Sequence, residues 1–232
     1  MKAEEVVAQR VTLDGVVYNE LLERIVSLTC PPGSMLYENV VAAEFGVSRT
    51  PVRRAFFQLA RDGLLTVLPQ RGARVSLLSS DKLREAQSVR EILEIAAFGE
   101  VARQWDGAAP RFARATREIL ACIAAQKEAV ARHDYLAFTG LDVQYHSLVL
   151  QLHGNATLLQ VVNDMRTHLK RLRFLELEVA HHEVEAIGHH EEILRLLQAG
   201  DVAGTRAALR RHLRMLAPLR ERLFTRHEGY FA

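Results

Sequence analysis

The 232-residue sequence is poor in cysteine and has no long apolar run. Its two cysteines, Cys30 and Cys122, lie far apart and form no CxxC spacing, which argues against a disulfide framework and indicates a reducing compartment. No apolar run approaches the roughly 18 residues that a membrane helix needs. The first ten residues carry Glu4 and Glu5 and lack the apolar segment of a signal peptide. We therefore expect a cytoplasmic protein with no membrane partner.

Net charge is also small, at +2, so any surface that binds nucleic acid must be a local one. Between Ser48 and Arg74 positive charge is concentrated, because the only acid there is Asp62. The basic residues of this stretch are Arg49, Arg53, Arg54, Arg61, Arg71 and Arg74. This asymmetry is typical of a surface that contacts phosphates.

The same stretch predicts the turn and opening of a DNA-recognition helix. Gly46 permits a sharp turn, Ser48 can cap the next helix, and Pro51 is tolerated in its first turn. A buried face recurs at helical spacing through Val52, Ala55, Phe56, Leu59 and Ala60. Arg49 and Arg53 fall on another face near the helix N-terminus, where helix-turn-helix proteins present side chains to the major groove.

The flanking residues predict a winged helix-turn-helix. Helices are expected at 16–28, 38–45 and 49–62. Residues 64–68 and 73–77 have the composition of short strands, and 69–72 joins them as a hairpin with Arg71 at its tip. Three helices followed by such a hairpin make a helix-turn-helix with one wing.

After Asp81 the sequence has no strand pattern. Apolar residues at i, i+3 and i+4 predict helices at 81–105, 110–132, 134–153, 155–179, 183–199 and 201–224. The expected fold class is therefore mainly α, an N-terminal winged helix-turn-helix plus a C-terminal all-helical bundle. The expected divisions are a flexible tail at 1–14, a DNA-binding domain at 15–77, a linker at 78–81 and a helical domain at 82–226.

Three histidines and one aspartate are predicted to point into the core of this bundle. Asp142 and His146, at i and i+4, share one helix face. His190 and His212 each lie on the apolar face of a different helix. Neutral imidazoles and a carboxylate suit a divalent ion such as Zn, Ni, Co or Mn. The alternative for each histidine is a hydrogen-bonded core residue without a metal.

Short motifs in both halves carry a family resemblance. In the first half they are residues 32–33, 46–53, 59–64 and 71–75. In the second half they are residues 89–94, 142–146, 190–193, 199–201 and 212. The chain resembles, over about 16–224, the GntR family of bacterial transcription regulators. Its second half resembles the FCD branch, whose helical domain binds small carboxylates.

The resemblance implies a ligand-responsive regulator, most often a repressor, whose homodimer reads a short palindrome in double-stranded DNA. The expected DNA contacts are Ser48, Arg49, Thr50, Arg53, Arg71 and Gly72. The resemblance also implies that Asp142, His146, His190 and His212 bind the metal, for which zinc is our first candidate, and makes 82–226 an effector-binding and dimerisation domain. Asn39 and Arg54 depart from the family pattern, which leaves the operator sequence open.

Arg90 is the residue that the resemblance assigns to the carboxylate of a small organic acid. A salt bridge to Glu91 or Glu94 is an equal alternative. Arg166, Lys170 and Arg173 share a helix face that we interpret mainly as solvated, with an inward Arg166 as the lesser alternative. We place His153 at the rim of the cavity. His189 is expected to face elsewhere, and His133, His168, His181, His182 and His227 are expected at the surface or in loops.

The competing function is a metal-dependent enzyme with an appended DNA-binding domain. Three histidines and a carboxylate could leave a coordination position open, as a hydrolytic metal site requires. However, the sequence has no HExxH motif and no second acid placed as a general base. A third alternative is a DNA-binding protein whose metal is purely structural. The prediction is therefore a regulator and not an enzyme.

Overall fold

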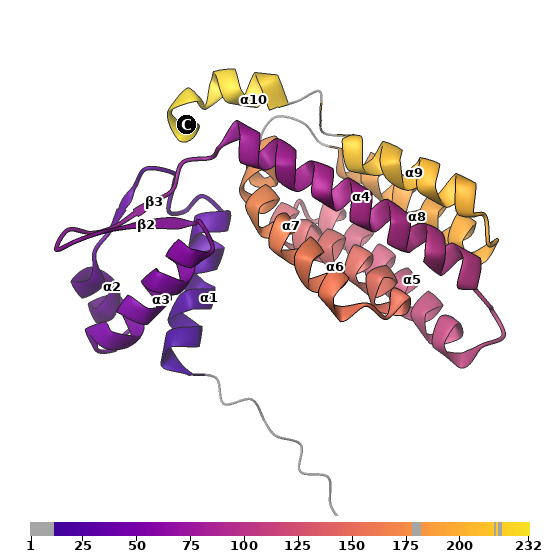
Figure 1. The fold of residues 1–232 in the computed structure, drawn as a ribbon, viewed down its shortest axis with the longest axis horizontal. Helices are drawn as coiled ribbons and strands as arrows, with labels where there is room; N and C mark the ends of the chain where they lie inside the picture. The colour runs from indigo at the N-terminus through magenta and orange to yellow at the C-terminus, as the bar shows by residue number, and fades with distance from the viewer. Residues whose placement is uncertain (1–11, 178–181, 216, 218–219) are drawn as a thin grey trace, which may run out of the picture. The chain divides into compact units, whose positions relative to one another are not determined.

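The computed structural model describes residues 12–232, apart from 178–181, 216 and 218–219. The chain divides into two compact units, one reaching to Leu78 and including Ala232, the other spanning Ser79–Phe231. The first unit carries a small sheet and the second is helical in its described part (Figure 1). This confirms the predicted fold class, a winged helix-turn-helix followed by an all-helical bundle.

The described part of the N-terminal unit, from residue 12 onward, contains three helices and three short strands. They are α1 (Leu13–Val26), β1 (Met35–Leu36), α2 (Glu38–Glu44), α3 (Arg49–Arg61), β2 (Leu65–Leu68) and β3 (Gly72–Val75). The α1 helix buries Val17, Leu21 and Ile25 in a core shared with α2, α3 and the sheet. Thr12 caps α1 by accepting a hydrogen bond from the Gly15 amide. The helix therefore begins inside the segment that the sequence predicted as a tail.

The recognition helix α3 follows its apolar pattern closely. Its buried residues are Val52, Ala55, Phe56 and Leu59, while Ala60 is half-buried. Gly46 has φ 62° in the turn before α3, and Gly63 has φ 73° just beyond its end. Both angles lie in the left-handed region that glycine adopts without a steric penalty.

The sheet has the order β1-β3-β2, with both pairs antiparallel. Leu65 pairs with Val75 and Leu68 with Gly72, so β2 and β3 form the wing hairpin. Strand β1 was not predicted, because two residues are too few for an alternating pattern to be recognised. It adds to the free edge of β3, with Met35 opposite Arg74.

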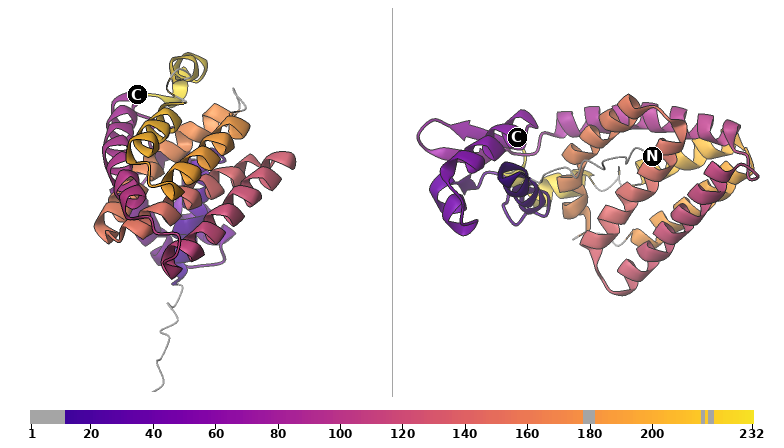
Figure 2. Two further views of the ribbon diagram at one scale, coloured as in Figure 1. Left: turned by 90° about the vertical axis from the view of Figure 1, so that its right-hand side faces the viewer. Right: turned by 90° about the horizontal axis from the view of Figure 1, so that it is seen from below.

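The second unit is built from long helices and two short C-terminal ones (Figures 1 and 2). They are α4 (Ser80–Gln104), α5 (Pro110–Ala131), α6 (Tyr135–His153), α7 (Ala156–Leu177), α8 (Glu183–Gln198), α9 (Val202–Arg214), α10 (Arg220–Arg226) and η2, a 3₁₀ turn at Glu228–Tyr230. Their common core includes the fully buried Phe98, Ile119 and Tyr145. None of the described helices is long and apolar enough to cross a membrane.

Two predicted boundaries in this unit differ from the structure. Ser79 accepts a hydrogen bond from the Lys82 amide and caps α4, which begins at Ser80. The predicted linker at 78–81 is therefore already half helical. The helix expected over 201–224 ends at Arg214, and the separate α10 follows, because periodicity continues across a break that leaves the apolar spacing intact.

Candidate metal centre and DNA-binding surface

Arg49 and Arg53 project from the first turn and the second turn of α3 into solvent. Their side chains are 63% and 57% exposed, and both reach the carboxylate of Glu38 at the start of α2. Arg53 donates from Nε at 3.0 Å and from Nη2 at 2.9 Å, and Arg49 donates from Nη2 at 3.2 Å. The Arg53 guanidinium holds the pKa of Glu38 below its usual value through these hydrogen bonds. One acid thus fixes the position of both arginines.

Sequence reasoning missed Glu38, although its position as first residue of α2 was within the predicted helix. The signal that could have found it is its negative charge. Glu38 begins the helix before the turn, and the two arginines lie at the start of the helix after it. Asp62, the one acid between Ser48 and Arg74, accepts a 2.7 Å hydrogen bond from the Tyr18 hydroxyl. Asp62 is therefore bonded to α1, and it also lies near Arg61.

Ser48 and Thr50 are both exposed beside the arginines. Ser48 occupies the N-cap position of α3, but its side chain makes no capping hydrogen bond, which corrects the expected role. Phe57, which the sequence analysis did not select, lies one turn beyond Arg53 and is 57% exposed. A solvent-exposed phenylalanine on this helix adds an apolar group to an otherwise basic surface.

The wing carries Arg71 in the turn between β2 and β3, and its side chain is exposed. Gly72 has φ 93°, and a Cβ there would lie 2.3 Å from the carbonyl oxygen of Leu36. Glycine is therefore required at this position by the close approach of β1, whatever else the wing contacts. The sequence analysis had given Gly72 only as an expected DNA contact.

The bundle brings together the four predicted ligands. Asp142 and His146 project from α6, His190 from α8 and His212 from α9, and all four are at most 2% exposed. One donor atom from each lies within 4.8 Å of all the others. The Nε2 atoms of His146 and His212 are 3.1 Å apart, and the Asp142 Oδ1 atom lies 3.5 Å from His190 Nε2 and 4.0 Å from His212 Nε2.

These separations suit a small cation. Ligands bound tetrahedrally at about 2.1 Å lie roughly 3.4 Å from one another, which the observed distances bracket. Three imidazoles and one carboxylate are also a donor set that Zn, Ni, Co and Mn accept. The group could therefore hold a divalent metal.

Two of the histidines are oriented by partners outside this group. The carboxylate of Glu94 accepts at 2.7 Å from His146 Nδ1, which leaves the Nε2 lone pair facing the centre. Gln126 donates its amide to the Leu141 carbonyl and presents its oxygen to His190 Nδ1 at 2.9 Å. Such partners fix the tautomer and ring orientation of metal-binding histidines.

Sequence reasoning named Glu94 only as an alternative partner of Arg90 and missed its contacts with His146 and Arg166. Glu94 is fully buried in α4 and lies between Arg90, whose Nε donates at 2.5 Å, and Arg166, whose Nη2 donates at 2.9 Å. Burial disfavours its charged form, but the positive charges of Arg166 and Arg90 and the contact with His146 hold its pKa well below the usual value. Glu94 is therefore a carboxylate shared by three partners.

The contacts of Glu94 correct the interpretation of Arg166 and bear on the two alternatives given for Arg90. Arg166 is 3% exposed and points inward from α7, because the buried charge of Glu94 requires a partner. The predicted solvated face is therefore wrong for Arg166. Arg90 is equally buried and does form the salt bridge to Glu94 that was one of its two alternatives. Burial lowers the pKa of Arg166 to about 10, which leaves it charged at neutral pH.

His146 is held in the form that binds metals. Burial lowers its pKa to about 4, with the nearby Glu94 carboxylate opposing that shift. Its imidazole is consequently neutral at physiological pH.

Tyr145 stacks on His190 with ring centroids 4.0 Å apart and donates its hydroxyl to the His190 carbonyl at 3.0 Å. His190 is thus held on its ring face by Tyr145 and at its Nδ1 atom by Gln126.

A small cavity of about 10 Å³ adjoins the centre on the side of α7. Its lining includes Asp142, Arg90, Arg166, Lys170 and Thr139. Among the described residues, Arg90 Nη2 and Arg166 Nε are buried and have no hydrogen-bond partner. Buried donors without partners are costly, so the cavity is a place where acceptor atoms would be stabilised.

Two further histidines, His153 and His189, are described next to other partners and do not belong to the four-residue group. His153 bonds to the Glu100 carboxylate at 3.0 Å. His189 packs edge-on against the His212 ring, with centroids 5.8 Å apart, so it is closer to the centre than predicted. The side chains of His168 and Arg173, and the whole of His181, lie outside the described residues.

Comparison with known proteins assigns both units. Residues 13–75 match the model of bacterial regulatory proteins of the gntR family, and residues 85–215 match the FCD domain model. The arrangement is therefore that of a bacterial transcription regulator and not of an enzyme. The chain belongs to the GntR family, whose members bind DNA operators, and its bundle is an FCD domain.

Individual relatives agree with this assignment. An uncharacterised helix-turn-helix regulator of Streptomyces ambofaciens is 31% identical over 93% of this chain and 88% of its own length. The repressor RspR of Escherichia coli is 27% identical over 87% of this chain and 86% of its own. The structure of E. coli McbR/YncC superimposes with a TM-score of 0.77 at 22% identity, covering 91% of this chain and 99% of that one, which shows a shared fold.

Proposed function

We propose that this protein is a DNA-binding transcriptional repressor whose FCD domain binds a divalent metal and a small carboxylate. The observation that carries the proposal is the buried group of Asp142, His146, His190 and His212 beside unpartnered arginine donors. A repressor role is supported by the name of the E. coli relative RspR. Cytoplasmic location follows from the function, because the operator lies in the cytoplasm of a bacterium.

DNA recognition is assigned to the exposed surface of α3 and the wing. Arg49 and Arg53 are suited to guanine, which arginine binds through O6 and N7. Ser48 has a hydroxyl that is not used in capping, and with Thr50 it would contact phosphates near the helix start. Arg71, next to Gly72, would follow the backbone or enter the minor groove. The DNA-binding domain is proposed to span 15–77.

The metal would be held by the four donors, with zinc as the first candidate and Ni, Co or Mn as the others. When bound, the ion supplies a Lewis acid that attracts an anionic ligand group. The rest of the site belongs to the chain itself. Glu94 and Gln126 orient two of the imidazoles, and the helices exclude water from around them.

The carboxylate would bind between the metal ligands and the arginines. Arg90, Arg166 and Lys170 bring three positive charges to the small cavity, against the carboxylates of Glu94 and Asp142. The excess favours one further anion, and arginine offers it two parallel hydrogen bonds. Because the cavity of about 10 Å³ holds no more than a water molecule, a ligand must widen it by moving α6 or α7.

That requirement links ligand binding to conformation. A ligand shifts an equilibrium only by its difference in affinity for two states, and here the closed state has no room for it. We infer that the wider state presents the two winged helices of a homodimer at a different spacing. The helical domain at 82–226 would provide both the effector site and the dimer contact.

The test is a thermal-shift screen of metal-free protein reloaded with Zn, Ni, Co or Mn, against small mono-, di- and hydroxy-carboxylates. A ligand at 100 times its Kd adds about 2.7 kcal/mol. This corresponds to several degrees for a domain of this size. The shift should require metal and should be lost in His146→Ala and in Arg90→Ala. The matched control is His153→Ala, which removes a histidine of the same helix that lies outside the four-donor group.

Other outcomes discriminate between the alternatives. Stabilisation by metal alone, unchanged by any acid and without an effect on operator binding, would make the metal structural. No stabilisation by any metal would remove the metal and the carboxylate from the proposal. Operator binding would then be tested by itself, through Arg49 and Arg53.

A further inference from the structure

The candidate metal centre is buried, so a metal ion needs a route to reach it. All four side chains of the centre are at most 2% exposed. The small cavity that adjoins them is lined by Arg90, Arg166 and Lys170 as well as by Asp142. A cation that approached through this cavity would meet three positive charges at close range, and like charges repel strongly where water is scarce.

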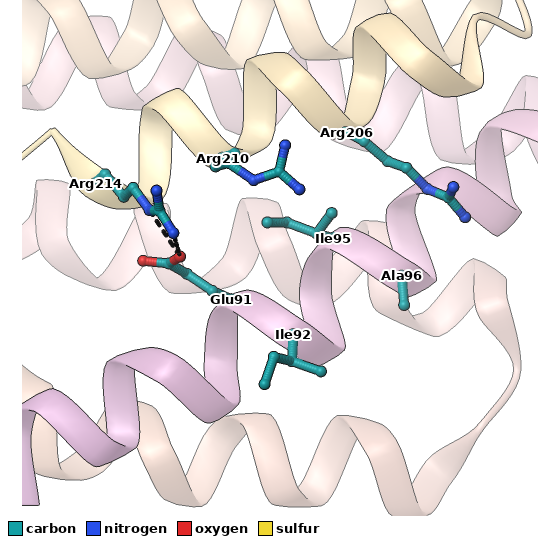
Figure 3. Close-up of a pocket in the computed structure, with 7 residues that line it drawn as sticks. All are labelled: Glu91, Ile92, Ile95, Ala96, Arg206, Arg210 and Arg214. Atoms are coloured by element: carbon teal, nitrogen blue, oxygen red, sulfur yellow. Dashed lines mark hydrogen bonds and ion pairs between the residues drawn. The ribbon is translucent and has the colours of Figure 1, made fainter.

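A larger hollow, the groove between α4 and α9, is no better suited to a cation (Figure 3). Its volume is about 360 Å³, and Arg206, Arg210 and Arg214 line it from α9. Glu91 also lines the groove, but its carboxylate accepts a hydrogen bond from Arg214 at 2.8 Å. The groove therefore attracts anions and repels a divalent cation.

One face of α8 offers the opposite chemistry. His182, Glu185 and His189 follow one another at spacings of three and four, which places them on the same side of the helix. Imidazole and carboxylate groups are the ligands that Zn and neighbouring divalent ions accept. Glu192 continues this face, but it is paired with Arg211 of α9. We call His182, Glu185 and His189 the α8 stripe.

The α8 stripe leads from solvent to the metal centre. The side chains of His182 and Glu185 are 34% and 56% exposed, whereas the side chain of His189 is only 13% exposed. The His189 ring packs edge-on against the buried ring of His212, with centroids 5.8 Å apart. The innermost residue of the stripe therefore touches one of the four candidate ligands.

Glu185 lies near both histidines of the stripe through different oxygens. Its Oε2 atom is 3.4 Å from His182 Nδ1, and its Oε1 atom is 4.0 Å from His189 Nε2. Two ligands of one tetrahedral ion lie roughly 3.4 Å apart, so a small rotation of the exposed Glu185 side chain brings either pair to that separation. The other ring nitrogen of His189, Nδ1, is buried and has no hydrogen-bond partner in the described part of the chain.

We propose that the α8 stripe is the site through which a divalent metal ion enters and leaves the buried centre. His182 and Glu185 capture the hydrated ion, Glu185 and His189 hold it next, and His212 receives it from His189. Each step replaces one ligand or water molecule by another and leaves the oxidation state unchanged. The inference rests on the metal site of the proposed function, and it gives the cation and the organic acid separate routes.

A residue of an entry route alters the rates of binding and release without altering the affinity. Metal-free full-length protein is mixed with Co²⁺ by stopped flow, with the visible absorption of the bound ion as the signal. Release into excess chelator gives the reverse rate. Glu185→Gln and His189→Gln should each lower both rate constants at least about tenfold, because the carboxylate no longer attracts the ion or the imidazole no longer binds it. The equilibrium dissociation constant should stay at the wild-type value.

Two controls test the position of the route. Glu191→Gln neutralises another acid of α8 that is about as exposed as Glu185 but pairs with Lys127 of α5. This variant should bind and release Co²⁺ as the wild type does. Arg210→Ala removes a positive charge from the groove of Figure 3, and it should also leave both rates unchanged. Circular dichroism checks that each variant is folded.

The outcomes separate the route from the metal site itself. A wild-type protein that binds no Co²⁺ would overturn the metal site and the route together. Binding with wild-type rates in both Glu185→Gln and His189→Gln would overturn the route alone and leave the centre in place. Faster loading of Arg210→Ala would place the entry in the groove instead. A weaker affinity with an unchanged association rate would make the altered residue part of the centre and would also overturn the route.

Discussion

The two units expose opposite kinds of site. In the N-terminal unit the candidate DNA contacts are side chains in solvent, with Arg49 and Arg53 more than half exposed and held by one partly exposed acid. In the bundle the candidate ligands are at most 2% exposed and held by buried charges. DNA is too large to enter a protein, whereas a metal and a small acid gain most from desolvated partners. The difference predicts where a mutation damages folding and where it damages only binding.

The largest effect on stability should come from removing a buried charge in the bundle. Glu94→Ala leaves Arg90 and Arg166 buried without their carboxylate, which should cost about 3–5 kcal/mol of unfolding free energy. Urea denaturation measures this. The matched control is Glu118→Ala, whose exposed contact with Arg114 is worth less than about 0.5 kcal/mol. Equal losses in the two variants would contradict the account of Glu94.

Removing the exposed arginines of α3 should do the opposite and weaken DNA binding with little effect on stability. The double variant Arg49→Ala/Arg53→Ala should unfold within about 1 kcal/mol of wild type, since exposed ion pairs contribute little. Its operator affinity should fall at least about 100-fold, because each base contact contributes about 1–3 kcal/mol. Fluorescence anisotropy at fixed salt measures the affinity. Binding as tight as wild type would reject the recognition surface.

A smaller effect should appear where a residue acts on the centre without joining it. Gln126→Ala removes the acceptor of His190 Nδ1 and should weaken metal binding about 10- to 100-fold. Isothermal titration with Zn would show whether the site keeps its one-to-one stoichiometry. Gln104→Ala, which changes an exposed glutamine of α4, should leave metal affinity as it is. Loss of all binding would instead make Gln126 a ligand.

The smallest effect should come from Glu38→Gln. The two arginines lose a charged partner and gain freedom, so binding to random DNA should strengthen a few-fold. The ratio of operator to random-DNA affinity should fall, because fixed side chains discriminate between bases better than mobile ones. Measuring both affinities over a salt series separates the phosphate contribution. An unchanged ratio would show that Glu38 has no part in selectivity.

Sequence alone predicted the local contacts and the four side chains that meet in the bundle core, but it missed the distant partners that hold them. The buried face of α3 and the shared face of Asp142 and His146 follow from helical periodicity within one segment. Glu94 meets His146 and Arg166 at separations of 52 and 72 residues, and no periodicity connects them. Helix periodicity also placed Arg166 on a polar face, since it records spacing and not what a neighbouring helix requires.

One helical turn of α4 carries both Arg90, which lines the cavity, and Glu94, which contacts His146. A buried salt bridge joins the two side chains within that turn. Closely packed interiors move as whole elements and resist local deformation. A ligand that displaced Arg90 would therefore also disturb the carboxylate that orients a candidate metal ligand. The affinity for a small acid and the affinity for a metal should accordingly depend on each other, and the dependence should be equal in both directions.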